Sequence, residues 1–204
     1  FGRTVAEELN KLGHQVMAVD KDEACVNEVL DFVTNAQIGD STNKEFLKSL
    51  GVDNYDVCIV TIKQNFQSSL ETTALLKDMG AKLVVSRAAN EFHSKFLLRN
   101  GADKVVFPEK QMAKLTAVRY TADHMFDYVQ LDENVSLFEL DVPKNWIGKT
   151  IAEIDVRKKY NINIIGTMVD GKVSATIGPD VVFTAEHHIL VMGSYKDVQK
   201  CFKL

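Results

Sequence analysis

The sequence has little cysteine and no long hydrophobic run. Its three cysteines, Cys25, Cys58 and Cys201, lie far apart without a C-x-x-C spacing. Neither a disulfide framework nor a cysteine-based zinc site is therefore predicted, and we expect a reduced, cytosolic protein. No apolar run reaches the roughly 18 residues needed to cross a bilayer. With 24 basic and 28 acidic residues, the charge balance argues against nucleic-acid binding.

Catalytic patterns are also missing. No serine or cysteine can be paired with a histidine base, and no G-x-S-x-G segment occurs. The adjacent His187 and His188 lie in an apolar strand, where a strand-end pair is the simpler interpretation than a metal site. An enzyme is not predicted. The 204 residues, 46% apolar and 25% charged, indicate one large or two small globular domains.

Helices and strands alternate strictly as far as residue 108. Helices are predicted at 4–12, 24–30, 42–50, 66–79 and 90–100, with strands at 15–20, 36–40, 57–62, 82–88 and 104–107. Thr42 and Glu45 suggest a capping box for the third helix. The strands are apolar along their whole length, which is typical of a parallel sheet covered on both faces. We therefore predict a Rossmann-like, doubly wound α/β domain.

The pattern changes after Pro108. Helical spacing of apolar residues predicts a connector helix over 111–128. From Ser136 the order becomes strand, helix, strand, hairpin strand, strand and helix, with Asp170-Gly171 as the hairpin turn. We expect a nucleotide-binding domain at 1–130, including the connector, and a small α+β domain at 131–204.

The first helix and strand suggest a nucleotide site. A helix starting at Gly2 and a strand ending at Asp20 match the second half of a dinucleotide-binding unit, in which the carboxylate holds the ribose hydroxyls. The preceding strand and first glycines of G-x-G-x-x-G would lie before Phe1. Asp40 and Ser41, after the next strand, either contact the adenine side of the nucleotide or simply cap a helix. Asp20 would repel a 2′-phosphate, so NADP is not expected.

Two further groups of residues are weaker candidates. Glu109 follows the last strand and could help hold a divalent cation, although a lone glutamate is usually a solvated turn residue. In the second domain, apolar residues beside an aspartate and an arginine could bind a nucleobase and a phosphate. The simpler alternative is core isoleucines with Asp155 and Arg157 as a surface pair. The residues of this candidate pocket are Ile151, Ile154, Asp155, Arg157, Asn163, Ile164 and Pro179.

Four segments carry a family resemblance that covers essentially the whole chain. They are A-V-D at 18–20, I-G-D-S-T at 38–42, N-G-A-D-K-V-V-F-P-E-K at 100–110 and I-D-V-R-K-K-Y-N-I-N-I-I at 154–165. They resemble the RCK (KTN) regulatory subunits of Ktr/Trk-type potassium uptake systems, most nearly the Ktr A-type subunit of Gram-positive bacteria. Members begin with a strand and G-x-G-R-F-G, of which Phe1-Gly2 would be the end.

The resemblance implies a cytosolic, non-enzymatic gating subunit. Such subunits form dimers and rings, typically octamers, that dock peripherally on a membrane potassium-translocating subunit. It implies ATP or ADP at Gly2, Asp20, Asp40 and Ser41, with NAD or NADH as possible ligands. It also implies a divalent cation, magnesium or calcium, at Glu109, and inhibitory cyclic di-AMP at the second-domain pocket. The alternative from the residues alone is an NAD-dependent oxidoreductase-like Rossmann protein.

Overall fold

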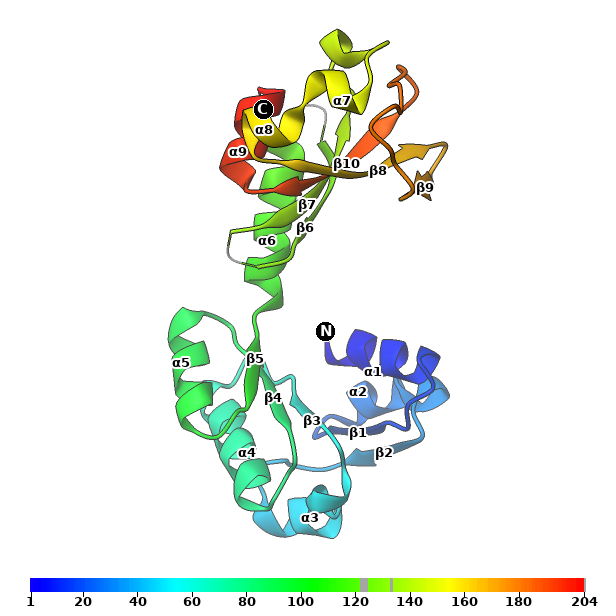
Figure 1. The fold of residues 1–204 in the computed structure, drawn as a ribbon. Coiled ribbons are helices and arrows are strands. Elements are labelled where there is room, and N and C mark those ends of the chain that lie inside the picture. Colours follow the sequence, from blue (N-terminus) through cyan, green and yellow to red (C-terminus); the bar gives the residue numbers. More distant parts are fainter. Residues whose placement is uncertain (122–124, 133, 204) are drawn as a thin grey trace. The chain divides into compact units, whose positions relative to one another are not determined.

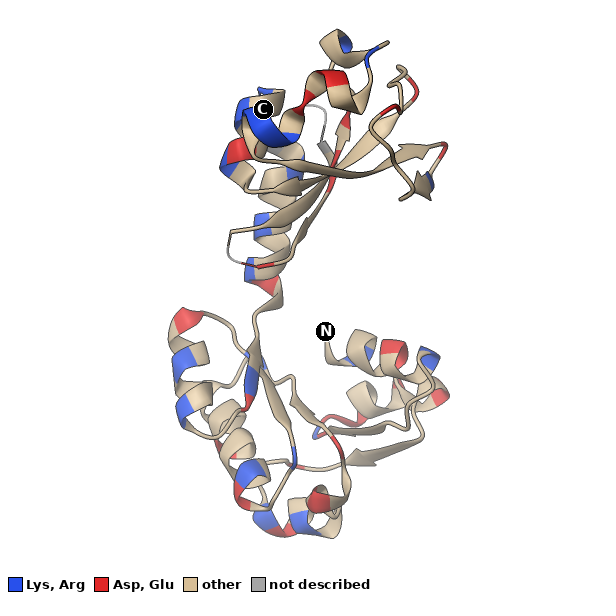
Figure 2. Ribbon diagram, in the orientation of Figure 1, with Lys and Arg blue, Asp and Glu red and all other residues tan. Residues whose placement is uncertain are grey.

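The computed structural model describes residues 1–121, 125–132 and 134–203. The chain divides into two compact units, Phe1–Lys110 and Gln111–Leu204 (Figure 1). The division falls earlier than the boundary expected near residue 130, because Leu115 and Val118 pack against the core of the second unit and residues 125–130 pair within its sheet. Most charged residues lie on helices and turns, whereas the strands are largely uncharged (Figure 2).

The first unit alternates helices with parallel strands. Strand β1 pairs with β2, and β3, β4 and β5 form a second set in that order, all in parallel register. This confirms the predicted Rossmann-like α/β fold. The elements are α1 (Gly2–Lys11), β1 (Met17–Asp20), α2 (Glu23–Asn27), β2 (Asn35–Ile38), α3 (Lys44–Ser49), β3 (Cys58–Val60), α4 (Phe66–Asp78), β4 (Val84–Arg87), α5 (Glu91–Arg99) and β5 (Lys104–Val106).

Side-chain caps explain where several of these helices begin. Asn90 caps α5 by accepting a hydrogen bond from the backbone N–H of His93, which agrees with the helix predicted from residue 90. The predicted Thr42–Glu45 capping box is wrong, because Asn43 caps α3 by accepting from the N–H groups of Glu45 and Phe46. Thr42 instead bonds to Asp40. An Asn side chain is as good a cap as Thr, so the spacing alone could not decide between them.

The second unit is built on one antiparallel sheet in the order β6-β7-β10-β8-β9. The hairpin predicted at Asp170-Gly171 is confirmed by the pairing of β8 with β9. The strands are β6 (Met125–Gln130), β7 (Ser136–Asp141), β8 (Asn163–Val169), β9 (Lys172–Ser174) and β10 (His188–Gly193). The helices are α7 (Ile151–Ile154), α8 (Val156–Tyr160) and α9 (Tyr195–Phe202), with α6 (Pro108–Thr121) leading in from the first unit.

Two helix predictions in this part of the chain are corrected. The connector helix expected at 111–128 is α6, which begins at Pro108 and ends at Thr121, and residues 125–130 form strand β6 instead. Residues 122–124 lie outside the described residues. The single helix predicted between the first two strands after Ser136 is instead the two short helices α7 and α8. Asp155 adopts a left-handed conformation with φ of 50° between them, which a continuous helix cannot include.

A contiguous apolar core holds the second unit together. Phe138, Leu140, Phe183 and Ile189 are fully buried within it, and Leu115 of α6 packs against it from the edge. This packing is the physical reason why α6 belongs to the second unit. The core positions on β7 alternate with partly exposed ones, as expected for a sheet covered on one face.

Candidate functional site

Polar side chains gather where the parallel strands of the first unit end. Asp20 ends β1 and Arg87 ends β4, while Asp40 and Lys63 follow β2 and β3 by a few residues. Ligands of open α/β sheets bind in the crevice outside this carboxyl edge. The sheet edge is therefore the candidate nucleotide site.

The larger hollow at this edge has a volume of about 560 Å³. Asp20, Asp40 and Ser41, all predicted as nucleotide-binding residues, line it together with Lys63. The structure therefore brings three of the four predicted residues to one hollow. Apolar residues of β3 line the same hollow, which gives it the mixed surface expected of a small-molecule site.

Hydrogen bonds hold the turn after β2 in one conformation. Asp40 accepts bonds from the hydroxyl of Thr42 at 2.7 Å and from its N–H at 2.9 Å. These two bonds lower the pKa of the Asp40 carboxyl, the hydroxyl bond contributing most. The Ser41 hydroxyl lies 2.9 Å from that of Thr72 on α4. Neither Asp40 nor Ser41 caps α3, which is capped by Asn43, and the Asp40 carboxylate lines the hollow.

Two glycines allow backbone segments to approach closely at the site. A Cβ on Gly39 would lie 2.2 Å from the Phe46 ring, and a Cβ on Gly2 would lie 2.6 Å from the Thr61 hydroxyl oxygen. Gly39 also donates its N–H to the carbonyl of Asp20 at 2.9 Å, which joins the ends of β1 and β2. A side chain at either position would displace the segments that line the site.

A second hollow of about 410 Å³ adjoins the first. Gly2, the fourth predicted nucleotide residue, lines it with Asp20 and Arg87. The Arg87 guanidinium carbon lies 5.0 Å from the centroid of the Phe1 ring, in a cation–π contact. Arg87 is largely buried, and its Nε has no hydrogen-bond partner among the described residues. This buried N–H is an unused donor beside the hollow.

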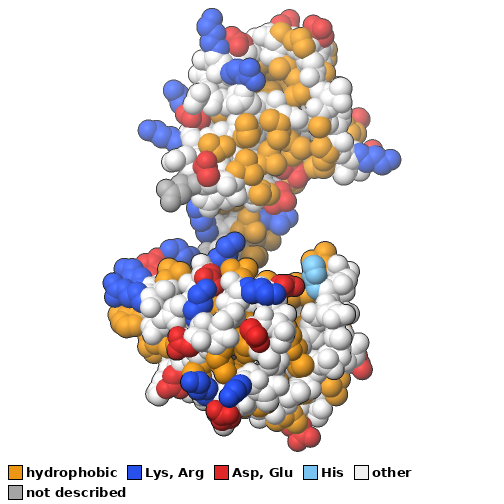
Figure 3. Space-filling view, turned by 60° about the horizontal axis from the view of Figure 1, so that its bottom comes forward, with side chains coloured by type: hydrophobic (Ala, Val, Ile, Leu, Met, Phe, Trp, Pro, Cys, Tyr) orange, Lys and Arg blue, Asp and Glu red, His pale blue; other side chains and the backbone are white. Residues whose placement is uncertain are grey.

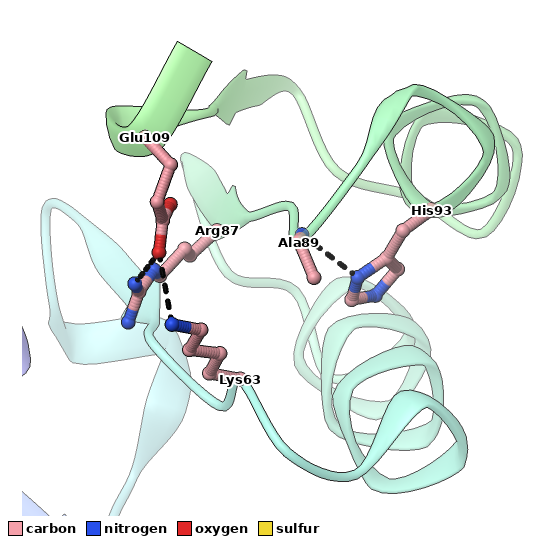
Figure 4. A network of polar contacts seen from close by, with 5 residues as sticks. All are labelled: Lys63, Arg87, Ala89, His93 and Glu109. Atoms are coloured by element: carbon pink, nitrogen blue, oxygen red, sulfur yellow. Dashed lines mark hydrogen bonds and ion pairs between the residues drawn. The ribbon is translucent and has the colours of Figure 1, made fainter. Parts of the chain in front are cut away.

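Glu109 lies between two basic residues (Figure 4). Its Oε1 is 2.5 Å from Nη2 of Arg87 and 3.1 Å from Nζ of Lys63. The backbone N–H of Glu109 itself, then Lys63 and Arg87, stabilise the charged form, and together they lower the pKa of the carboxyl to about 2. Glu109 is ionised at neutral pH and its charge is balanced by this chain's own cations.

This arrangement does not fit the divalent cation expected at Glu109. A hard cation needs several oxygen ligands and an available negative charge. Here the carboxylate is occupied by two cationic side chains, and the described residues include no group of three or more His, Cys, Asp or Glu side chains able to hold a metal. Glu109 alone is therefore not a cation site in this conformation.

His93 is a buried polar residue near this network (Figure 4). Its Nδ1 accepts a hydrogen bond from the backbone N–H of Ala89 at 3.2 Å, and burial lowers its pKa. Its Nε2 has no partner among the described residues. The ring packs against Phe66 with centroids 4.8 Å apart. His93 is therefore a neutral packing residue that positions the start of α5.

The candidate pocket of the second unit lies around α7, α8 and the start of β8. Arg157 donates from Nε to Oδ1 of Asn163 at 2.7 Å, and the backbone N–H of Ala152 donates to the carbonyl of Pro179 at 2.9 Å. The alternative of an Asp155–Arg157 surface pair is not what the described residues show. Ile154 belongs to the buried core, whereas Ile151 and Ile164 are partly buried against it.

Lys63 and Arg87 were missed by sequence reasoning, although a signal for them existed. Both lie at the carboxyl ends of predicted strands, the same rule that singled out Asp20 and Asp40. Basic side chains at that edge are as well placed for phosphates as carboxylates are for a ribose. The Phe1 ring stacked on Arg87 could not be predicted, since it depends on where α1 begins.

Comparison with known proteins decides the family. The TrkA-N domain family matches residues 1–108, and the TrkA-C domain family matches residues 135–204. The chain belongs to the RCK regulatory subunits of Ktr/Trk-type potassium uptake systems. The family membership expected from the four sequence segments is thus confirmed.

Two curated relatives from Bacillus subtilis strain 168 extend over nearly the whole chain. Ktr system potassium uptake protein C is 37% identical and protein A is 32% identical, each over 200 residues that cover 98% of this chain and 90% of the relative. Among solved structures, a GsuK channel bound to NAD has the same fold, with a TM-score of 0.61 and 19% identity over 96% of this RCK chain and 36% of the channel chain. Among its described residues, this RCK chain has no helix long and apolar enough to span a membrane.

Proposed function

We propose that this RCK chain is a nucleotide-controlled gating subunit of a potassium uptake system. ATP or ADP, with NAD or NADH as the alternative dinucleotides, binds at the carboxyl edge of the first unit. The observation that carries this proposal is the hollow lined jointly by Asp20, Asp40, Ser41 and Lys63. It presents carboxylates for a ribose and a cation for a phosphate at the edge where open α/β sheets bind ligands.

Titration calorimetry with Asp20→Ala tests the nucleotide site. A carboxylate that accepts ribose hydroxyls contributes charge-assisted bonds, so we expect ATP and NAD affinities to fall at least about tenfold. Asp31→Ala, an exposed aspartate outside both hollows, is the matched control and should bind as the wild type does. Equal affinities for the wild type and Asp20→Ala would contradict the proposal.

The second unit, in this proposal, binds cyclic di-AMP as an inhibitor. Two subunits form a dimer whose two-fold axis matches the symmetry of the ligand. Arg157 of each subunit meets a phosphate, and Ile151 and Ile164 pack on the adenines. The exposed guanidinium of Arg157, already directed toward Asn163 at 2.7 Å, supports this placement.

Arg157→Ala tests this ligand site in the whole protein. We expect cyclic di-AMP affinity to fall at least about tenfold while the dimer persists, because loss of one charge-assisted contact typically has this effect. Lys158→Ala, on the next position of α8 and likewise exposed, is the control and should retain binding. Full affinity in Arg157→Ala, or two ligands bound per dimer, would exclude a shared pocket.

The partners follow from the same proposal. Dimers assemble into an octameric ring, which docks on a membrane potassium-translocating subunit at the cytosolic face of the membrane. A divalent cation joins Glu109 only if the contacts of that carboxylate change.

The competing function is an NAD-dependent oxidoreductase. Turnover of NADH by the purified protein would favour it, whereas nucleotide-dependent change in ring size by light scattering would favour gating.

A further inference from the structure

We propose that Lys63 and Arg87 form the phosphate-binding pair of the first unit and that Glu109 is their intramolecular competitor. The inference rests on the proposed nucleotide function and adds how the site is controlled. In the absence of ligand, the Glu109 carboxylate occupies both cations. The terminal phosphates of a nucleotide then have to displace it.

Position is the first argument for the pair. Lys63 lines the larger hollow with Asp20, and Arg87 lines the adjoining one with Gly2 and Asp20. The two cations therefore border both parts of the candidate nucleotide site, whereas Glu109 lines neither hollow. A carboxylate behind two cations that face a site is placed to compete for them.

The bonding of Arg87 is the second argument. Its Nη2 contacts Glu109, its face stacks on Phe1, and its buried Nε has no partner among the described residues. A buried guanidinium N–H without a partner is unusual, because such groups are normally paired. A phosphate could accept two bonds from this planar group, which a single carboxylate oxygen does not.

Exposure is the third argument, since the contact must be reversible. The side chains of Lys63 and Glu109 are 54% and 43% exposed. The Lys63–Glu109 ion pair is weak at this exposure, and the half-exposed carboxylate can also leave the more buried Arg87 when a polyphosphate carrying several charges replaces it. Release of Glu109 leaves its charge free, and only then does the carboxylate become available to a cation. The misfit between Glu109 and a cation in the ligand-free chain follows from this competition.

The test measures ATP binding to the whole protein by calorimetry in EDTA, without divalent cations. Glu109→Gln removes the competitor and keeps its shape, so we expect ATP affinity to rise by about three- to tenfold, the range that one or two exposed ion pairs would cost. Glu91→Gln is the matched control. It breaks the exposed ion pair between Glu91 and Lys110 near the same edge, frees a lysine that lines neither hollow, and should leave the affinity unchanged.

Two further variants separate competition from a general charge effect. Lys63→Met should weaken ATP binding in EDTA. In the Lys63→Met background, Glu109→Gln should raise ATP affinity by a smaller factor, because the Lys63 ammonium that Glu109 occupied is no longer present. Lys63 is exposed, so the variant is expected to fold. Arg87→Lys, which keeps the charge but not the planar donors, should also weaken binding.

The outcomes separate this inference from the function on which it rests. If ATP binds in an Asp20-dependent way but Glu109→Gln binds it equally or more weakly, the competitor role is overturned and the nucleotide site stands. An equal gain from Glu91→Gln, or a gain that is the same with and without Lys63, would also overturn it. If neither the wild type nor Glu109→Gln binds ATP, the proposed function and this inference are both excluded.

Discussion

The two units of the chain differ in what they bury. The second unit has a continuous apolar core that includes the fully buried Phe138 and Phe183. In the first unit the fully buried residues include Ser69, Thr73 and Ser86, and its apolar core is split into two small clusters. The second unit therefore has a single apolar core. The first unit buries hydroxyl groups at positions where apolar side chains would stabilise the fold more.

The difference extends to the sheets and surfaces. In the second unit all described strands belong to one sheet, but in the first β1 and β3 are in separate sheets beside the two hollows. On the surface of the second unit, hydrophobic side chains form a broad group (Figure 3). The exposed hydrophobic residues of this unit include Phe126, Val129 and Val173. The first unit is thus organised around the hollows at the edge of its strands, and the second around one continuous apolar core.

The largest expected effect is in the core of the second unit. Phe138→Ala removes a fully buried ring and should lower the free energy of unfolding by about 3–5 kcal/mol, because a cavity remains. Hydrogen exchange measured by mass spectrometry should assign the loss to residues of the second unit. Phe92→Ala, at a 63% exposed position of the first unit, is the control. A similar loss of unfolding free energy in both variants would show that the core of the second unit contributes no more than an exposed position of the first.

Ligand binding should stabilise the first unit selectively. ATP at a hundredfold excess over its Kd should raise the free energy of unfolding by about 2.7 kcal/mol. The protected amides should lie in residues 1–110, since the hollows are there. Protection confined to the second unit would place the ATP site elsewhere. Asp20→Ala, with an affinity at least about tenfold lower, should gain at most about 1.4 kcal/mol at the same ATP concentration.

Gly39→Ala should perturb the hollow more than the helix content. The added Cβ would clash with the Phe46 ring, and such overpacking typically costs about 1–3 kcal/mol. We also expect weaker ATP binding, because the turn carrying Asp40 must move. Combining Gly39→Ala with Phe46→Leu should restore part of both losses. A double variant no better than Gly39→Ala would show that the clash is not the cause.

The buried hydroxyl groups of Thr73 and Ser86 form a hydrogen-bonded pair, which explains how the first unit tolerates polar side chains in its interior. Thr73 donates to the carbonyl of Ser69 at 2.7 Å, so Ser86, 2.8 Å away, is the donor to Thr73. Thr73→Val leaves the Ser86 hydroxyl unpaired and should cost about 1–3 kcal/mol. Adding Ser86→Ala should recover part of this cost in chemical denaturation. Strictly additive losses would mean that the pair is not coupled.

The smallest expected effect is an acid-dependent one at Asp103. The ion pair with Lys77 at 2.6 Å, and then the N–H of Val84 at 2.7 Å, lower the pKa of this carboxyl below its ordinary value of 3.8. A folded pKa below the unfolded one stabilises the fold above about pH 4 and loses that contribution as the pH falls through the folded pKa. In chemical denaturation, Asp103→Asn should therefore have a lower free energy of unfolding than the wild type at pH 7, and the difference should shrink as the pH falls below about 4. A constant difference across this range would exclude the ionised form as the cause.

Local signals in the sequence were sufficient for most elements of the first unit. The helix predicted at 90–100 and the parallel sheet predicted from continuous apolar strands are both present, because caps and burial patterns act within a few residues. The connector helix was predicted too long, since a 3.6-residue pattern over 111–128 continued through a segment whose last residues pair with β7. That pairing depends on a distant strand, so helical spacing could not exclude it.

The sequence by itself determined the fold class, the family, and the edge at which Asp20, Asp40 and Ser41 meet. Parallel strands end at one edge whatever their neighbours are, and therefore strand ends are enough to place these residues. Only the tertiary structure decided that Glu109 contacts Arg87 and Lys63, and that Arg87 lies under Phe1. These contacts join side chains from the ends of two strands, from the first turn of α6 and from the residue before α1, and their distances depend on how helices pack on the sheet. No pattern within the chain specifies that packing.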